Sequence, residues 1–199
     1  LGGSRHSWLG HVPCSVAVAS PCGAANWLGL HRWRAQSCVA RDRCRELSRG
    51  RRWRDQAGAL EQRRLLEGRR LSARELLDAC RRRAEATEPV VNALVEVDWE
   101  RGASVADRLD AEPGFLPDAP LRGLVIAHKN LLDTAGVRTT YGSPAFAGHV
   151  PTVSHPLVGL LAGAGTVFVG KTNTPEFGAG SHTFNPVHGL TRNPWDPTR

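Results

Sequence analysis

Lysine is the residue type in this chain whose chemistry is easiest to single out. Only two lysines, Lys129 and Lys171, stand beside 24 arginines in 199 residues. An arginine stays protonated in any surroundings, whereas a buried lysine can lose its proton and then act as a base. Both lysines follow apolar runs. They are therefore the first candidates for proton-transfer chemistry.

Lys129 comes just after the apolar run Leu124 to Ala127, which predicts a buried strand. Burial at the end of that strand would favour the neutral amine, which can accept a proton. A lysine that instead leaves the strand into a solvated loop needs no catalytic explanation. The local sequence leaves both interpretations open.

Lys171 lies in a segment, 165–172, that satisfies the phosphate-loop pattern G-x-x-x-x-G-K-[ST]. That motif needs a flexible loop between its two glycines and a helix that begins at the lysine. Here residues 166–169 are β-branched and aromatic, and Asn173-Thr174-Pro175 does not begin a helix. The sequence therefore disfavours nucleotide binding.

Cysteine and histidine spacings do not indicate a metal site. Seven, fifteen and five residues separate Cys14, Cys22, Cys38 and Cys44, which matches no zinc knuckle. His182 and His188 have no carboxylates in ligand register. We expect neither a metal nor another cofactor.

The elements around the two lysines follow from local signals. Residues 57–66 predict a helix that ends at Gly68, and Ser72 with Glu75 forms a capping box for a second helix, which we expect Pro89 to stop. Further on we expect, in chain order, a strand over 90–97, a helix over 99–109, a loop over 111–120, a strand over 123–127, a helix over 155–161 capped by Ser154, and a short strand over 166–169. This alternation indicates the α/β class.

Charge divides the chain. Residues 1–85 hold 18 arginines and eight acidic residues, a net +10, whereas residues 86–199 hold eight basic and eleven acidic residues, a net −3. We interpret residues 1–52 as a poorly ordered basic leader or a misplaced start, and 53–199 as the domain. The arginines of segment 41–54 leave open a basic nucleic-acid-binding protein, although no binding module is recognisable.

Several targeting and membrane features are weak or missing. Pro21 and Asn26 interrupt the only stretch that resembles a signal sequence, and no apolar run approaches the ~20 residues of a membrane span. We therefore expect a cytoplasmic location and no contact with a membrane. The chain begins at Leu1 and contains no methionine, so we expect a fragment or a misplaced start.

Two long motifs resemble the amidase signature family. They are LRGLVIAHKNLLDTAGVRTTYGSPAF (121–146) and GAGTVFVGKTNTPEFGAGSHTFNPVHGLTRNPWDPTR (163–199). The resemblance implies an incomplete amidase-signature fold, a mixed sheet flanked by helices. It also implies a hydrolase that cleaves a small carboxamide through a Ser–cis-Ser–Lys triad. Lys129 matches the catalytic lysine, and Lys171 matches a position with a structural role beside the site.

The same resemblance implies further site residues and partners. Gly178, Gly180 and Ser181 fall where the family lines its acyl pocket. The alternative within the superfamily is one subunit of a tRNA-dependent amidotransferase, which requires partner subunits. We expect a homodimer for the full-length protein and no bound nucleic acid.

Departures from the family pattern carry their own expectations. The segment that supplies both catalytic serines should begin just beyond Arg199, so we expect both to be absent and the isolated chain to be inactive. Ser143 and Ser181 are the serines best placed to substitute, an interpretation that we disfavour. Asn130 stands where the family usually has Asp and His128 where it usually has an aliphatic residue, which affects the polar bonding around Lys129.

Overall fold

The computed structural model describes residues 57–198. Its centre is a three-stranded sheet of order β1-β3-β2, formed by β1 (Leu94–Val97), β2 (Val125–Lys129) and β3 (Val167–Thr172). Strand β1 runs antiparallel to β3, and β2 runs parallel to β3. The sheet is therefore mixed, which confirms the α/β prediction, and β3 occupies its middle.

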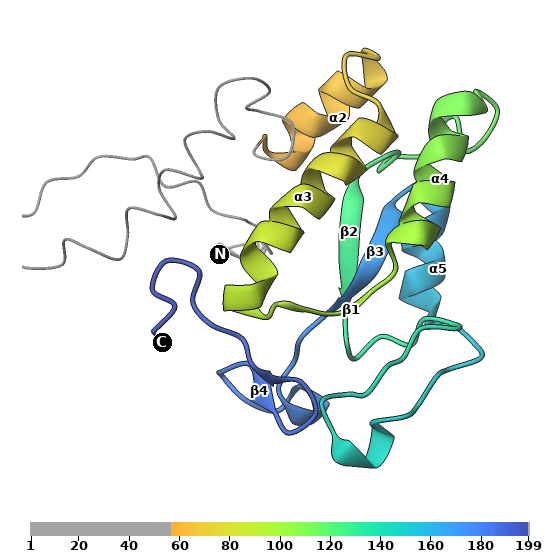
Figure 1. Cartoon of the computed structure of the whole chain (residues 1–199). Coiled ribbons are helices and arrows are strands. Elements are labelled where there is room, and N and C mark those ends of the chain that lie inside the picture. Colours follow the sequence, from red (N-terminus) through yellow and green to blue (C-terminus); the bar gives the residue numbers. More distant parts are fainter. Residues whose placement is uncertain (1–56, 199) are drawn as a thin grey trace, which may run out of the picture.

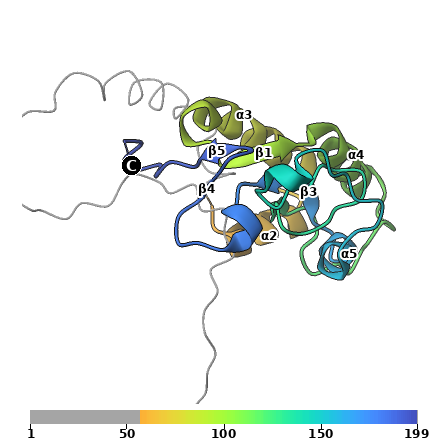
Figure 2. The same ribbon diagram turned by 90° about the horizontal axis from the view of Figure 1, so that it is seen from below.

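Helices cover both faces of this sheet. Helices α3 (Ala73–Val91) and α4 (Trp99–Ala111) lie on one side, and α5 (Pro156–Gly163) lies on the other (Figures 1 and 2). A shorter helix, α2 (Ala59–Glu67), precedes α3 and ends at Gly68 as predicted. The layered arrangement buries an apolar face of each helix against the sheet.

The apolar core lies between the sheet and the pair α3 and α4. Helix α4 can approach β3 closely because position 102 is a glycine, where an added Cβ would lie 2.9 Å from the carbonyl oxygen of Phe168. The buried members of the core cluster are small or branched aliphatic residues: Ala73, Leu77, Ala106, Leu109, Val167 and Val169.

The start of α3 is fixed by the predicted capping box. The Ser72 hydroxyl accepts from the Glu75 amide at 3.0 Å, and the Glu75 carboxylate accepts from the Ser72 amide at 3.1 Å. A second carboxylate, that of Asp110 in α4, accepts from the amides of Ala73 and Arg74, both at 2.9 Å. These acceptors satisfy amides that the first helical turn leaves without a partner, and the last pair ties α3 to α4.

The predicted end of α3 was wrong. The helix continues past Pro89 to Val91, and Asn92 ends it in the left-handed conformation with φ 55°. A proline removes one backbone donor, which a helix tolerates more easily in its last turn than in its middle. The strand predicted over 90–97 consequently begins only at Leu94.

Two boundaries near β3 also differ from prediction. The ring Nδ1 of His155, not Ser154, accepts from the Leu157 amide at the start of α5, whereas the Ser154 hydroxyl accepts from the Ala135 amide at 3.0 Å. Strand β3 continues beyond Val169 to Thr172, because β1 and β2 both pair with its last residues.

Long segments follow β2 and β3 and gather at one end of the sheet (Figure 1). The first contains the short helix η1 (Pro144–Phe146), and the second contains η2 (Glu176–Gly178) and the hairpin of β4 (Phe184–Asn185) with β5 (Gly189–Leu190). Because β2 and β3 are parallel, their carboxyl ends meet at this end, which is where ligands usually bind in α/β sheets.

Residues 1–52, which we interpret as a leader, lie outside the described residues, as do four of the five cysteines and the arginines of segment 41–54. The proposed boundary at residue 53 also lies there. Among residues 57–198, no helix is both long enough and apolar enough to cross a bilayer.

Candidate functional site

The two lysines occupy neighbouring strands but very different surroundings. Lys129 is the last residue of β2, opposite Thr172 of β3, and its side chain is exposed. Lys171 lies opposite His128 of β2 and is completely buried. Because successive residues of a strand point to opposite faces, His128 and Lys171 share one face and Lys129 points to the other.

Burial, which the sequence left open for Lys129, is found at Lys171. It lowers the Lys171 pKa to about 8, although the negative charges of Asp133 and Glu96 oppose that shift. The Lys171 amine donates to the carbonyl of Leu132 in the segment after β2. Lys171 lies within a strand and no helix begins there, so the geometry of a phosphate loop is absent from this part of the described chain.

His128 fills the space beside Lys171. Burial, and secondly the nearby Lys171 charge, lower the His128 pKa to about 4, so the ring is neutral at pH 7. Its Nδ1 lies 3.3 Å from the Thr134 hydroxyl, and its ring centroid lies 4.6 Å from that of Phe168. An aromatic neighbour and burial explain how a histidine replaces an aliphatic residue here.

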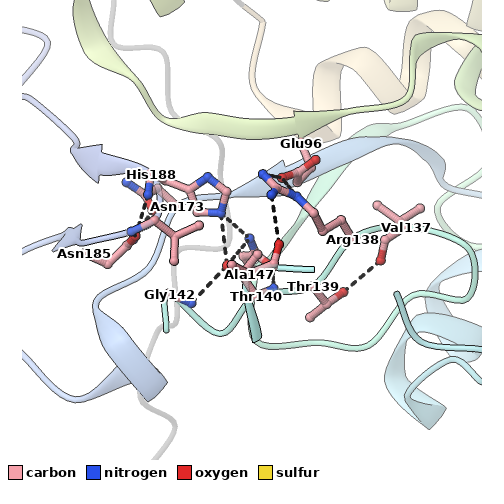
Figure 3. Close-up of polar contacts among 12 residues, drawn as sticks. Glu96, Val137, Arg138, Thr139, Thr140, Gly142, Ala147, Asn173, Asn185 and His188 are labelled. Atoms are coloured by element: carbon pink, nitrogen blue, oxygen red, sulfur yellow. Dashed lines mark hydrogen bonds and ion pairs between the residues drawn. The ribbon is translucent and has the colours of Figure 1, made fainter. Parts of the chain in front are cut away.

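The residue after Lys129 anchors a polar cluster. Asn130 is fully buried; its Oδ1 accepts from the Thr140 amide at 3.0 Å, and its Nδ2 lies 3.2 Å from Nε2 of His188. Figure 3 shows the His188 ring directed at Thr140, whose hydroxyl lies 3.0 Å from Nε2. An amide both donates and accepts, which a carboxylate cannot do, so Asn suits this position.

His188 is neutral in this cluster for a physical reason. Burial lowers its pKa, the negative charge of Glu96 opposes the shift, and the positive charge of Arg138 adds to it. With Asn130 Nδ2 as a donor, Nε2 of His188 acts as the acceptor. The sequence analysis treated His188 as an ordinary loop residue and missed this contact, because 58 residues separate it from Asn130.

A second set of amides fixes the segment after β3. Asn185 Nδ2 donates to the Asn173 side chain at 2.7 Å and to the Thr174 carbonyl at 2.8 Å. Its Oδ1 accepts from the amides of Val187 and His188 at 2.9 and 2.7 Å. One buried side chain therefore positions the hairpin that carries His188 (Figure 3).

The predicted pocket residues lie in the segment after β3. Gly178 has φ 74°, and an added Cβ would lie 2.7 Å from a methyl of Leu131, two residues beyond Lys129. Gly180 and Ser181 are exposed. Ser143, the other serine that could substitute, is buried, and its amide donates to the Thr140 carbonyl.

Sequence reasoning also missed an aromatic group at this end of the sheet. Tyr141 lies 5.1 Å from Phe146 and 6.5 Å from Phe177, measured between ring centroids. Tyr141 and Phe177 both adopt positive φ, 52° and 50°, which is uncommon for bulky residues. Burial and the Asp133 carboxylate, which accepts from the Tyr141 hydroxyl, raise the Tyr141 pKa to about 12.

Within residues 57–198, no group of three or more histidines, cysteines and carboxylates is placed to hold a metal ion. The side chains that gather at the carboxyl ends of β2 and β3 are instead an exposed amine, neutral hydrogen-bonding groups and aromatic rings. Such a set can bind and transfer protons with an uncharged polar substrate.

Comparison with known proteins gives curated relatives that are components of one enzyme. A glutamyl-tRNA(Gln) amidotransferase subunit from Oleidesulfovibrio alaskensis is 41% identical over 129 residues, which are 65% of this chain and 26% of that protein. The same subunit from Azoarcus sp. is 38% identical over 143 residues, 72% of this chain and 29% of the relative. This chain therefore spans less than a third of the length of either relative.

Solved structures agree with the fold. A crystal structure of an amidase is 33% identical, with a TM-score of 0.64 over 72% of this chain and 33% of that one. A 6-aminohexanoate cyclic dimer hydrolase is 27% identical, with a TM-score of 0.62 over 72% of this chain and 29% of that one. The Amidase family model matches residues 75–199. This chain belongs to the amidase signature family.

Proposed function

We propose that this chain forms the part of an amide hydrolase that supplies Lys129 as the proton acceptor of a Ser–cis-Ser–Lys triad. The observation that carries the proposal is the position of Lys129. Its backbone is held beside β3, where the Asn130 amide donates to the Thr172 carbonyl at 2.9 Å, while its amine faces outward at the end of the sheet. A reacting group needs this combination of a fixed base and an accessible end.

In the proposed reaction, the neutral Lys129 amine takes the proton of a middle serine, which takes that of the nucleophilic serine. The nucleophile attacks the carboxamide carbon, and the C–N bond breaks as the amine leaves with a proton. Water then hydrolyses the acyl-enzyme to the carboxylate. Both serines lie outside this chain in the proposal. The substrate is a small carboxamide whose acyl group meets Gly178, Gly180 and Ser181.

The test uses the isolated chain and a longer protein that continues into the family's serine-rich segment. We expect the isolated chain to hydrolyse no amide. In the longer protein, Lys129→Arg keeps the positive charge but removes the ability to become neutral, so we expect kcat to fall ~10²–10⁴-fold. Arg82→Ala, an exposed change on α3, is the control and should leave kcat unchanged. Full activity in Lys129→Arg would refute the proposal.

A second candidate function has support in the curated relatives, each of which is named as one component of an amidotransferase. In that case the protein acts on glutamyl-tRNA(Gln) together with partner subunits. Purification of the longer protein from its own cells distinguishes the two proposals. Stable association with other subunits, and amide turnover that depends on them, would favour the amidotransferase.

A further inference from the structure

Lys171 is the largest side chain that is completely buried in the described residues. It lies in the central strand, opposite Glu96 of β1 on one side and His128 of β2 on the other. An amine in such a place is costly unless hydrogen bonds compensate for the water that it has lost. A buried aliphatic side chain would fill the same space without that cost, so this lysine calls for an explanation.

The hydrogen bond of the Lys171 amine reaches across β2 to the Leu132 carbonyl. The same carbonyl accepts from the Thr134 hydroxyl at 3.3 Å. On the other side of that residue, the Leu132 amide donates to the carbonyl of Lys129 at 3.0 Å. Leu132 is therefore held at both its N–H and its C=O, and it links the buried amine to the backbone of the exposed lysine.

The electrostatic surroundings keep this amine a strong donor at neutral pH. Asp133 and Glu96 counter part of the effect of burial, and the pKa of about 8 leaves most of the amine protonated at pH 7. His128, which faces Lys171 from β2, is neutral at that pH and adds no repulsion. A charged donor forms a stronger hydrogen bond to a carbonyl than a neutral one.

We propose that Lys171 is a positioning residue for Lys129. Its amine holds the Leu132 carbonyl, and Leu132 in turn holds the Lys129 backbone, so that the exposed amine leaves the sheet in a defined direction. The catalytic consequence rests on the proposed function, but the linkage between the two lysines is a property of this chain alone. The motif that resembles a phosphate loop thereby acquires a different role, as a support inside the sheet.

The two lysines allow a direct test by NMR on the whole chain. Labelling lysine with ¹³C at Cε gives two signals, and Lys171→Met leaves that of Lys129 alone. In Lys171→Met we expect the Lys129 signal to move and exchange of the Leu132 amide proton to accelerate at least about tenfold, the loss of one hydrogen bond's worth of protection. Lys171→Arg keeps a charged donor and should restore part of that protection.

Thr166→Val is the matched control. Thr166 is also buried in this part of the fold, and its hydroxyl donates to a carbonyl, that of Leu161, at the opposite end of β3. We expect this variant to leave the Lys129 signal and the Leu132 amide unchanged. Should Lys171→Met leave both unchanged, or Thr166→Val alter them equally, Lys171 would be an ordinary buried residue and the proposal would be overturned.

Two further measurements separate this proposal from the proposed function. In the unaltered chain, the protonated Lys171 amine should give a resolved ¹⁵N-detected signal near neutral pH, because burial slows its exchange with water; a missing signal contradicts the proposal even where Lys171→Met does not fold. In the longer protein, Lys171→Met should lower kcat without raising KM, and Lys171→Arg should recover part of it. If the longer protein hydrolyses no amide, the proposed function fails while the NMR result still decides the linkage.

Discussion

The two halves of the described structure are held together by different forces. Between the sheet and helices α3 and α4, the buried residues are aliphatic, with Leu77 and Val167 in the core cluster. At the carboxyl ends of β2 and β3, the buried residues are instead mostly polar and neutral: Asn130, Thr134, Thr139, Thr140, Ser143, Asn173, Thr174 and Asn185. One region depends on removing apolar surface from water, the other on satisfying each donor and acceptor.

This difference fits a division between scaffold and site. Aliphatic packing tolerates exchange of similar side chains, whereas a buried hydrogen-bond network specifies one arrangement and loses stability if a single member is removed. Lys129 lies where the two regions meet, as the last residue of β2, with the polar cluster starting at Asn130. A residue at this junction has a rigid sheet behind it and defined polar neighbours in front.

The largest effect is expected from the aliphatic region. Leu77 is 2% exposed, and Leu77→Ala leaves a cavity between α3 and the sheet that the surrounding helices cannot fill. We expect the free energy of unfolding to fall by about 2–5 kcal/mol. Urea unfolding followed by circular dichroism measures it.

The matched control is Leu60→Ala in α2, where the leucine is 78% exposed. That variant should change the free energy of unfolding by no more than about 0.5 kcal/mol. Equal losses in the two variants would mean that the packing of α3 on the sheet does not hold this region together.

Sequence reasoning succeeded in the first region and largely failed in the second, for a physical reason. The capping box of Ser72 and the apolar stripe of α3 are local patterns, because a helix repeats every 3.6 residues. Asn130, Thr140 and His188 meet although 48 or more residues separate His188 from either partner. No short-range pattern encodes such a contact.

Lys129 illustrates the limit of the family resemblance. The motif identified it as the candidate base, but neither the motif nor the local sequence could decide its exposure, which depends on the chain packed around β2. For Lys171, the apolar residues before it indicated a strand, yet the predicted strand stopped at Val169. Pairing with β1 and β2, a non-local interaction, extends the strand and buries the lysine.

The polar region should respond almost as strongly to the loss of one amide. Asn185→Ala removes four hydrogen bonds and leaves buried partners of Asn185 without a donor or acceptor. We expect a loss of about 2–4 kcal/mol, concentrated in faster amide exchange of the β4–β5 hairpin. Asn193→Ala, at an exposed turn, is the control and should cost less than about 1 kcal/mol. A loss in Asn185→Ala as small as the control's would show that water replaces the network readily.

Acid should weaken the fold through His128. Its pKa of about 4 in the folded chain lies below the ordinary 6.5, so the unfolded chain binds the proton first. The stability that the neutral ring contributes is therefore complete above pH 6.5 and is lost as pH falls towards 4. We expect that loss to be on the order of 2 kcal/mol.

Urea unfolding at a series of pH values measures this contribution as a difference between proteins. Between pH 6.5 and 4, the wild-type chain should lose stability more steeply than His128→Leu, which has no ring to protonate. His182→Gln changes an exposed histidine and should follow the wild type. Parallel curves for the wild type and His128→Leu would contradict the assignment.

The smallest effect is expected from the ion pair of the polar region. Arg138 Nε donates to the Glu96 carboxylate at 2.6 Å, and the Arg138 side chain is 40% exposed (Figure 3). Glu96→Gln keeps an acceptor and removes the charge, so we expect a cost below about 1 kcal/mol that shrinks towards zero in about 1 M salt. Glu85→Gln, which breaks the more exposed pair with Arg81 in α3, should cost still less. If Glu96→Gln destabilised the chain more than Asn185→Ala does, charge and not neutral hydrogen bonding would hold the polar region, and the contrast between the two halves would have to be drawn differently.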